Sequence, residues 1–198
     1  MSTRQLVCVV LAAGNGTRMV SNTPKVMHEL AGKPLLGHVV STVSSLESAG
    51  VYVVLRHKKE LLAEYLTANF PKSILVEQDD IAGTGRAVEV SLDKIPSDFD
   101  GDVLVVSGDV PLMDVDTLSA LVESHRSSKA SATILTALVD DPSGYGRIVR
   151  SKEGTVAKIV EHLDASEAEA AIKEINAGVY VFDVAHLRQG LSHLDSHN

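Results

Sequence analysis

The sequence predicts an α/β fold, with a mostly parallel sheet, helices on both of its faces and a small antiparallel extension. Apolar, β-rich runs alternate with helical patterns as far as residue 138, an order typical of right-handed βαβ units. The early runs, such as Leu6–Leu11, are continuously apolar, which is expected of strands that helices cover on both sides. After residue 140, shorter expected strands follow one another, and this succession indicates the antiparallel extension.

The individual elements follow from the same patterns. Apolar runs bounded by turn-forming residues predict strands at Leu6–Leu11, Val51–Leu55, Ser73–Val76, Val103–Val106, Ala132–Leu138, Gly146–Val149, Val156–Glu161 and Ile175–Phe182. Helical patterns predict helices at Pro34–Ser48, Glu60–Ala68, Gly85–Leu92, Asp116–Ser127, Glu167–Lys173 and Ala185–Leu191. Ser166 and Glu169 form a capping-box signature at the start of the helix near Glu167.

Composition narrows the class of protein. The 198 residues, 44% of them hydrophobic, are expected to form a single domain (1–198), without internal repeats or linkers. A net charge of −8 and the lack of any basic run argue against nucleic-acid binding. No apolar run approaches the roughly 20 residues of a membrane span, and no secretory signal is evident. The single cysteine, Cys8, is expected to be a buried small hydrophobe. We therefore expect a cytoplasmic protein that does not bind membranes.

The first candidate site is the segment from Leu11-Ala12-Ala13-Gly14 to Gly16, Arg18 and Lys25, which directly follows the first expected strand. Glycines let backbone N–H groups approach an anion, and Arg18 and Lys25 add donors suited to phosphate. The segment lacks the third glycine of a dinucleotide fingerprint, and the chain contains no P-loop string. The segment therefore predicts a polyphosphate-binding loop. Taken alone, it is also compatible with an ordinary turn.

A second candidate site is Asp109, within Ser107-Gly108-Asp109-Val110-Pro111-Leu112 after the expected strand Val103–Val106. In a parallel sheet, this carboxylate lies at the same edge as the glycine loop. A carboxylate that faces bound phosphates is a typical ligand for Mg²⁺. The alternative is a structural turn residue.

Two further stretches carry candidate binding residues. Gln78, Gly83 and Thr84 lie between a short expected strand and a helix, where Gln78 can offer an amide donor and acceptor to a base. Glu161 and Asn176 are strand-end polar residues that could bind a sugar. Each is also compatible with a purely structural role.

Together these stretches resemble one family. The order Leu-Ala-Ala-Gly-x-Gly-Thr-Arg-Met…Pro-Lys, Gly-Thr-Gly, Gly-Asp-Val-Pro-Leu, Gly-Tyr-Gly-Arg-Ile, Ile-Val-Glu and Ile-Asn-Ala-Gly-Val-Tyr is similar to the uridylyltransferase domain of bacterial N-acetylglucosamine-1-phosphate uridylyltransferases. These enzymes belong to the nucleotide-diphosphate-sugar pyrophosphorylases. The likeness runs from about Val7 to Asp183. It implies a Rossmann-like sheet of the nucleotide-diphospho-sugar transferase type.

The resemblance also implies roles for single residues. The family pattern places the nucleotide at Leu11, Ala12, Ala13, Gly14, Gly16, Gln78, Gly83 and Thr84, with uracil near Ala13, Gly14 and Gln78. Arg18 and Lys25 would be the catalytic cations, and Asp109 would bind Mg²⁺. Gly146, Glu161 and Asn176 would line the sugar pocket, together with Thr84.

The implied reaction is uridylyl transfer from UTP to N-acetylglucosamine 1-phosphate, which yields UDP-N-acetylglucosamine for cell-wall precursors and releases pyrophosphate. The chain departs from the family pattern at Arg86, where His is usual, and it stops before the family's second metal-binding Asn. It also lacks the hexapeptide repeats of the β-helix domain through which the family trimerises. We therefore expect a C-terminally incomplete domain. The alternatives are a nucleotide-sugar-binding domain with little turnover and a transferase for CTP or another sugar phosphate.

Overall fold

The computed structural model describes residues 4–14, 16, 19 and 21–192, and its chain divides into two compact units. The first unit comprises residues 1–133 and 180–198, and the second comprises residues 134–179. Their boundary falls within strands β7 (Ala132–Leu138) and β10 (Glu174–Asp183), which each contribute to both units. The single domain expected from the sequence stays a prediction.

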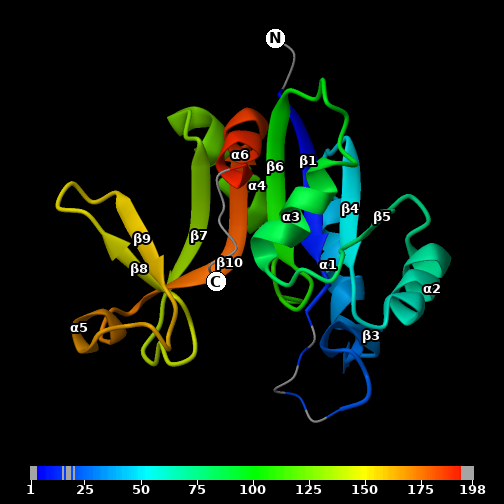
Figure 1. Ribbon diagram of the computed structural model, residues 1–198, viewed down its shortest axis with the longest axis horizontal. Helices are drawn as coiled ribbons and strands as arrows, with labels where there is room; N and C mark the ends of the chain where they lie inside the picture. The colour runs from blue at the N-terminus through cyan, green and yellow to red at the C-terminus, as the bar shows by residue number, and fades with distance from the viewer. Residues whose placement is uncertain (1–3, 15, 17–18, 20, 193–198) are drawn as a thin grey trace. The chain divides into compact units, whose positions relative to one another are not determined.

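The first unit is built on a parallel sheet in the order β5-β4-β1-β6 (Figure 1). Its strands are β1 (Gln5–Leu11), β4 (Gly50–Leu55), β5 (Ile74–Glu77) and β6 (Gly101–Ser107). The end of β10 joins the sheet antiparallel to β6, with Tyr180 opposite Val105. The predicted α/β fold with a mostly parallel sheet is confirmed.

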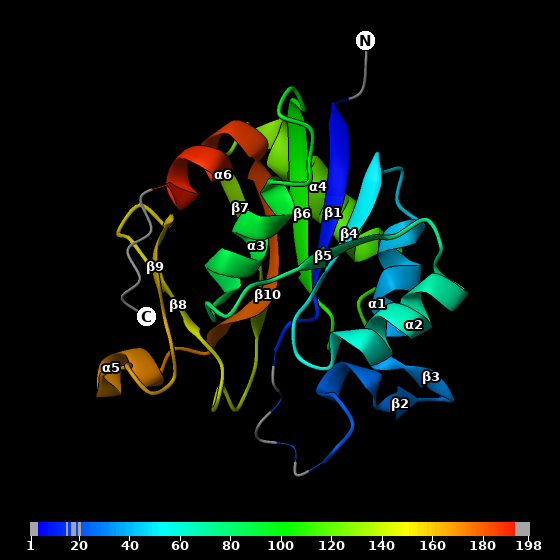
Figure 2. The same cartoon turned by 45° about the vertical axis from the view of Figure 1, so that its right-hand side comes forward.

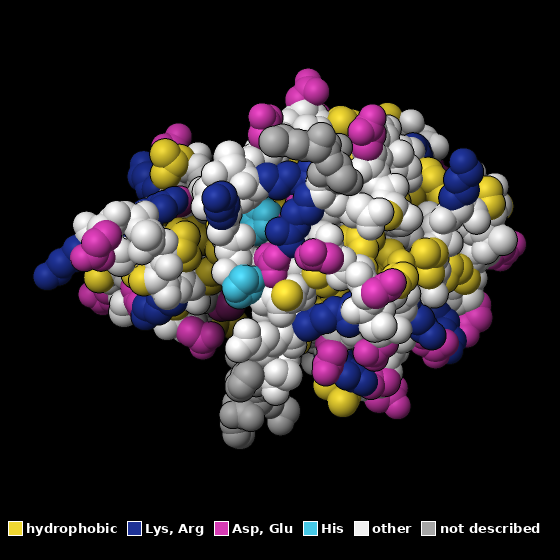
Figure 3. Space-filling view, turned by 90° about the horizontal axis from the view of Figure 1, so that it is seen from above, with side chains coloured by type: hydrophobic (Ala, Val, Ile, Leu, Met, Phe, Trp, Pro, Cys, Tyr) yellow, Lys and Arg dark blue, Asp and Glu magenta, His cyan; other side chains and the backbone are white. Residues whose placement is uncertain are grey.

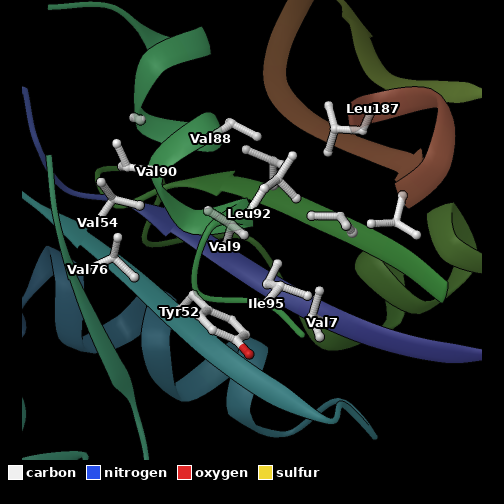
Figure 4. Packing of buried hydrophobic residues seen from close by; sticks show 14 of the residues in the cluster. Val7, Val9, Tyr52, Val54, Val76, Val88, Val90, Leu92, Ile95 and Leu187 are labelled. Atoms are coloured by element: carbon white, nitrogen blue, oxygen red, sulfur yellow. The ribbon is translucent and has the colours of Figure 1, made fainter. Parts of the chain in front are cut away.

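Helices cover both faces of this sheet, as the continuous apolar strands predict. They are α1 (Leu35–Ser44), α2 (Lys59–Asn69), α3 (Thr84–Leu92), α4 (Val115–Ser128) and α6 (Val184–Leu191). Figure 2 shows α3 in front of the sheet and α4 behind it. On the α3 side, Val9 and Val54 of the strands pack with Val88 and Leu92 of α3 and Leu187 of α6 (Figure 4).

The alternate residues of these strands face the other side of the sheet, because successive side chains of a strand point in opposite directions. Cys8, Val10, Leu104 and Val106 are buried there. Burial raises the pKa of the Cys8 thiol to about 12, although a hydrogen bond with Ser48 lowers it. Cys8 is thus the buried small hydrophobe that the sequence predicts. No helix in the described part of the chain is both long and apolar enough to cross a membrane.

Three short elements in the first unit were not predicted. The 3-10 helix η1 (Lys25–Met27) follows the glycine segment, and β2 (Glu29–Leu30) and β3 (Lys33–Pro34) pair as a small hairpin. The helix predicted to reach Ser48 ends at Ser44 instead, because Ser45 and Leu46 make shorter-range hydrogen bonds to Thr42 and Val43.

The second unit contains the predicted antiparallel extension. β8 (Arg147–Arg150) pairs antiparallel with β9 (Val156–Val160), and Ile175 of β10 lies opposite Arg147 of β8. The capping box between Ser166 and Glu169 is present, but its helix α5 (Glu167–Ala170) has only four residues. The sequence predicted that this helix would reach Lys173, but it ends at Ala170. The Lys173 carbonyl instead accepts a hydrogen bond from the Val139 N–H, and β10 begins at the next residue.

A buried carboxylate lies near the amino ends of the parallel strands. Figure 3 shows Lys and Arg side chains gathered beside a His on the face seen from above. Asp102 of β6 is 1% exposed, and its two oxygens lie 2.9 Å from Arg4 Nε and 2.6 Å from Arg126 Nε. The Arg4 guanidinium also pairs with Asp183. Asp102 therefore links the start of β1, the end of α4 and the end of β10.

Replacing Asp102 by alanine removes the shared acceptor of this network. We expect Asp102→Ala to lower the free energy of unfolding by at least about 1.5–3 kcal/mol, the contribution of one hydrogen bond to a charged group. Urea denaturation measures it. Asp100→Ala is the matched control, because Asp100 is 92% exposed and lies 3.8 Å from Arg4. Equal losses in the two variants would contradict the structural role of Asp102.

Candidate active site

A cavity of about 570 Å³ opens at the carboxyl ends of the parallel strands in the first unit. Parallel α/β sheets bind their ligands at this edge. The cavity is lined by Leu11, Ala13, Gly14, Gly16, Met19, Lys25, Val26, Arg56, Gln78, Ala82, Gly83, Thr84, Ala87, Ser107 and Asp109. Nine of these are residues that the sequence singled out as nucleotide-binding, catalytic or metal-binding. Residues predicted from three separate stretches of the sequence therefore lie around one space.

The glycine segment forms the part of the cavity that follows β1. Gly16 has a φ of +57°, and a Cβ on it would lie 2.8 Å from the Cβ of Lys25. Only glycine therefore allows the segment to pass this close to η1. Ala12, between the lining residues Leu11 and Ala13, is buried and does not line the cavity itself. Arg18, predicted to be the second catalytic cation, lies outside the described residues.

Lys25 and Asp109 form an ion pair inside the cavity. Lys25 Nζ lies 2.5 Å from Asp109 Oδ2, and the Ser107 hydroxyl donates to Asp109 Oδ1 at 2.6 Å. Lys25 begins η1, whereas Asp109 follows β6, so the pair joins two loops that lie far apart in the sequence. The side chain of Lys25 is 43% exposed and that of Asp109 is 22% exposed, which leaves both groups within reach of a ligand.

The protein keeps Asp109 ionised. Burial raises the pKa of this carboxyl, but the hydrogen bonds from Lys25 and Ser107 lower it, and the net result is a pKa below its ordinary value. Asp109 thus presents a carboxylate, the form that binds a metal ion or a cationic side chain, at neutral pH.

The donors around Asp109 suit Mg²⁺. The carboxylate and the Ser107 hydroxyl offer hard oxygen atoms on one side of the cavity. The described residues contain no group of three or more His, Cys, Asp or Glu side chains that would hold a metal by themselves. A single carboxylate fits an ion that keeps several waters and takes its other ligands from substrate phosphates, which is the habit of Mg²⁺.

The side chain of Gln78 is fixed by its own loop. Gln78 is 4% exposed, and its Nε2 donates to the carbonyl oxygens of Ile81 (2.8 Å) and Gly83 (3.2 Å). Two acceptors facing one end of the amide assign the nitrogen to that end. The sequence suggested that Gln78 offers both a donor and an acceptor to a ligand. In the fold, its Nε2 donates within its own loop, and Oε1 forms the other end of the amide.

The cavity also holds a cation that the sequence analysis missed. Arg56 lines the cavity and donates from Nη2 to the Asp80 carbonyl at 2.7 Å. It directly follows β4, just as Asp109 follows β6. The rule that ligands bind beyond the carboxyl ends of parallel strands would have found it, but no motif marks it.

The three residues predicted to bind the sugar lie together in the second unit. A Cβ on Gly146 would lie 3.1 Å from Glu161 Oε1, and the backbone N–H of Asn176 donates to the Gly146 carbonyl at 2.9 Å. Gly146 therefore lets the Glu161 carboxylate approach the backbone closely. The fold thus groups Gly146, Glu161 and Asn176, which are widely separated in the sequence.

Removing the Lys25 ammonium should change the acidity of Asp109. We expect a higher Asp109 pKa in Lys25→Met, because burial still raises it while one of the opposing hydrogen bonds is lost. In the unaltered chain, the pair stabilises the fold fully above the unfolded-state pKa of about 3.9, and this stabilisation is lost as the pH falls through the lower folded-state pKa. An NMR titration of the Asp109 carboxyl carbon, without divalent cations, measures this pKa in Lys25→Met and in the unaltered chain.

Lys59→Met is the control for this titration, because Lys59 pairs with Glu77 and does not line the cavity. It should leave the pKa of Asp109 unchanged. An Asp109 pKa that is equal in Lys25→Met and in the unaltered chain would show that the pair is not formed in solution.

Comparison with solved structures supports the architecture. The chain matches a UDP-glucose pyrophosphorylase complexed with UDP-glucose at a TM-score of 0.77, with 19% identity over 96% of this chain and 80% of that one. It matches a putative glucose-1-phosphate thymidylyltransferase from Bacillus anthracis at a TM-score of 0.78, with 19% identity over 96% of this chain and 76% of that one. At these identities, the likeness establishes the fold alone, which is that of nucleotide-diphospho-sugar transferases.

Sequence comparison gives nearer relatives. The chain is 51% identical over its full length to the bifunctional protein GlmU of Leifsonia xyli subsp. xyli, and 48% identical over 194 residues to that of Mycolicibacterium smegmatis. It spans 41% and 40% of these proteins, respectively. Residues 8–178 match the model of the MobA-like NTP transferase domain. The chain therefore belongs to the family of MobA-like NTP transferase domains, which places it among the nucleotidyltransferases.

Proposed function

We propose that the chain transfers a uridylyl group from UTP to N-acetylglucosamine 1-phosphate, forming UDP-N-acetylglucosamine and pyrophosphate. Support comes from the identity of about half of its residues to GlmU proteins and from the resemblance of its motifs to uridylyltransferases. The observation that carries the proposal is the Lys25–Asp109 ion pair, which lies in one cavity with the glycine segment and Gln78.

The reaction needs no covalent enzyme intermediate. A phosphate oxygen of the sugar phosphate attacks the α-phosphorus of UTP, the bond from that phosphorus to the bridging oxygen breaks, and pyrophosphate leaves with the electron pair. Catalysis then rests on holding the two phosphates in line and on neutralising the charge that develops between them. The residues needed are fixed cations and oxygen ligands, which are the groups that the cavity offers.

Lys25 supplies one of these cations. In the unliganded chain, its ammonium is held by Asp109 on the side of the cavity where the triphosphate would lie. A phosphate oxygen can take the place of Asp109 at little cost, because partly exposed ion pairs contribute only about 0–1 kcal/mol. Lys25 would then hold the α-phosphate, and the Asp109 carboxylate would be released. Arg18 is proposed as a second cation on the resemblance alone.

Asp109 would then hold Mg²⁺, with the Ser107 hydroxyl beside it. When bound, the ion supplies charge neutralisation and orientation of the triphosphate. Asp109 serves this role because its depressed pKa keeps it ionised in the neutral pH range.

Gln78 and Gly83 would select the base. With its Nε2 engaged by Ile81 and Gly83, Gln78 presents Oε1 as an acceptor. Uracil carries a hydrogen on N3 that can donate to such an acceptor, whereas N3 of cytosine carries none. An unpaired buried acceptor costs about 1–3 kcal/mol, and we therefore expect a preference of roughly 10- to 100-fold for UTP over CTP. The backbone of Ala13 and Gly14 would contact the same base.

The sugar phosphate is assigned to the second unit. Glu161 and Asn176 offer a carboxylate and an amide, which suit the hydroxyl and acetamido groups of N-acetylglucosamine. A role in cell-wall precursor synthesis and a cytoplasmic location belong to the same proposal.

Pyrophosphate release from UTP, N-acetylglucosamine 1-phosphate and Mg²⁺ tests the proposal. We expect turnover by the unaltered chain, its loss when Mg²⁺ is chelated, and a fall of at least about 100-fold in Asp109→Asn, because losing even an outer partner of a metal ligand costs 10- to 100-fold. A panel of CTP, UTP and other sugar phosphates in the same assay measures the substrate preference.

Asp114→Asn is the matched control for this assay. Asp114 caps α4 by accepting from the Thr117 N–H, lies outside the cavity, and can be replaced by Asn without loss of the cap. Its turnover should equal that of the unaltered chain. Binding of UDP-N-acetylglucosamine without turnover, a preference for CTP, or full activity of Asp109→Asn would each contradict the proposal.

A further inference from the structure

The loop that carries Gln78 is exposed, and polar contacts rather than apolar packing hold it. Residues 79–83 lie between Gln78 and the start of α3, and all of them are exposed. Ile81 is the large apolar side chain among them, and it is 57% exposed. Burial of apolar surface therefore does little to hold this loop, although the loop fixes the amide of Gln78.

The main clamp on the loop is an ion pair to α3. Arg86 donates to both carboxylate oxygens of Asp79, with Nε at 3.2 Å from Oδ1 and at 3.0 Å from Oδ2, and with Nη2 at 2.5 Å from Oδ2. Because two nitrogens of Arg86 donate to one carboxylate, they fix the orientation of the Asp79 side chain as well as its distance from Arg86. The hydrogen bond from Arg86 lowers the pKa of Asp79, so the pair persists throughout the neutral range.

The clamp is connected to Gln78 by hydrogen bonds. Asp79 Oδ1 accepts from the backbone N–H of Ile81 at 3.1 Å, and the carbonyl of Ile81 accepts from Gln78 Nε2 at 2.8 Å. The route from Arg86 to Gln78 therefore runs through Asp79 and one residue of backbone. A second contact, from Arg56 to the Asp80 carbonyl, holds the other side of the loop.

Arg86 itself does not line the cavity, whereas its neighbours Thr84 and Ala87 do. We infer that Arg86 is a positioning residue for base selection, and that through Asp79 it holds the loop in the conformation that turns Gln78 Oε1 toward the base. This inference rests on the proposed function, because it assigns the base to Gln78. It goes beyond that proposal by placing the control of base preference on a side chain that does not touch the nucleotide.

The consequence is a specific pattern of defects. Without Arg86, the loop loses the contact that aligns Asp79 and Ile81, and Gln78 can turn its amide either way. Binding of UTP then weakens, and its advantage over CTP shrinks. The Lys25–Asp109 pair is untouched, so the chemical step at saturating UTP keeps its rate. Because an exposed ion pair contributes little to stability, the fold itself should be unaffected.

Calorimetric binding of UTP and CTP to the full chain, with steady-state kinetics beside it, tests this inference. In Arg86→Ala, we expect the Kd and KM for UTP to rise by about 2- to 30-fold, the range for positions that act without contacting the ligand. The ratio of UTP to CTP affinity should fall by a similar factor, with kcat within about twofold. Arg86→Lys should recover part of the loss, since Lys keeps the charge but not the paired geometry.

Two further variants separate this role from a general structural one. Glu89→Gln removes the other carboxylate that Arg86 contacts, at 2.7 Å, and should behave like the unaltered chain. Asp79→Asn keeps an acceptor for the Ile81 N–H but loses the charge, and it should show the Arg86→Ala pattern more weakly. If circular dichroism shows that Arg86→Ala does not fold, Asp79→Asn still tests the inference.

Unchanged base preference in Arg86→Ala and Asp79→Asn, or equal losses for UTP and CTP, would overturn the inference. A rise in Kd for Glu89→Gln equal to that for Arg86→Ala would also overturn it. If the unaltered chain prefers CTP, the proposed uridylyl transfer fails, and the inference about uracil fails with it. If the unaltered chain prefers UTP and the Arg86→Ala and Asp79→Asn variants keep the same preference, the inference alone fails.

Discussion

Parallel pairing of β1 with β4 on one side and with β6 on the other is the constraint on which the rest of the candidate site depends. The pairing continues as single backbone hydrogen bonds just beyond the strand ends. Ala12 N–H donates to Val54, Gly108 N–H donates to Leu11, and Gln78 N–H donates to Leu55. These bonds start three loops from one edge of the sheet. A shift of register by one residue would turn the whole apolar set of a strand to the other face, so the buried strands hold this arrangement firmly.

Strand β6 shows how one sheet supports two kinds of carboxylate. Asp102, at its amino end, is fully buried and forms ion pairs with two arginines, and these contacts tie elements together. Asp109, just past its carboxyl end, is partly exposed and bonded to one lysine inside a cavity. A buried pair is costly to break, whereas a partly exposed pair exchanges partners readily. The same residue type therefore serves the fold at one edge of the sheet and is available for ligands at the other.

Much of the fold could be predicted because long apolar runs have few alternatives. The strands at Leu6–Leu11 and Val103–Val106 are close to those observed in β1 and β6, and the order of strands and helices implied the parallel sheet. The short hairpin of β2 and β3 left no such signal, because two-residue strands have no periodicity. The early ends of α1 and α5 depend on local hydrogen bonds to neighbouring loops, which the amino-acid pattern does not record.

The candidate site was predictable to the extent that motifs mark it. Gly16, Gln78 and Asp109 stand in recognisable stretches, and the fold brings them around one cavity. The contact between Lys25 and Asp109 depends on tertiary structure, as does the internal hydrogen bonding of Gln78. Arg56 was missed because it belongs to no motif, although its place at the end of a parallel strand is the same as that of Asp109.

A crystal structure of the chain with a bound non-hydrolysable UTP analogue and Mg²⁺ tests the central claim most directly. We predict uracil against Gln78 and Gly83, with Lys25 on a phosphate oxygen and Asp109 on the metal ion. A nucleotide bound outside this cavity, with Lys25 still paired to Asp109, would contradict it.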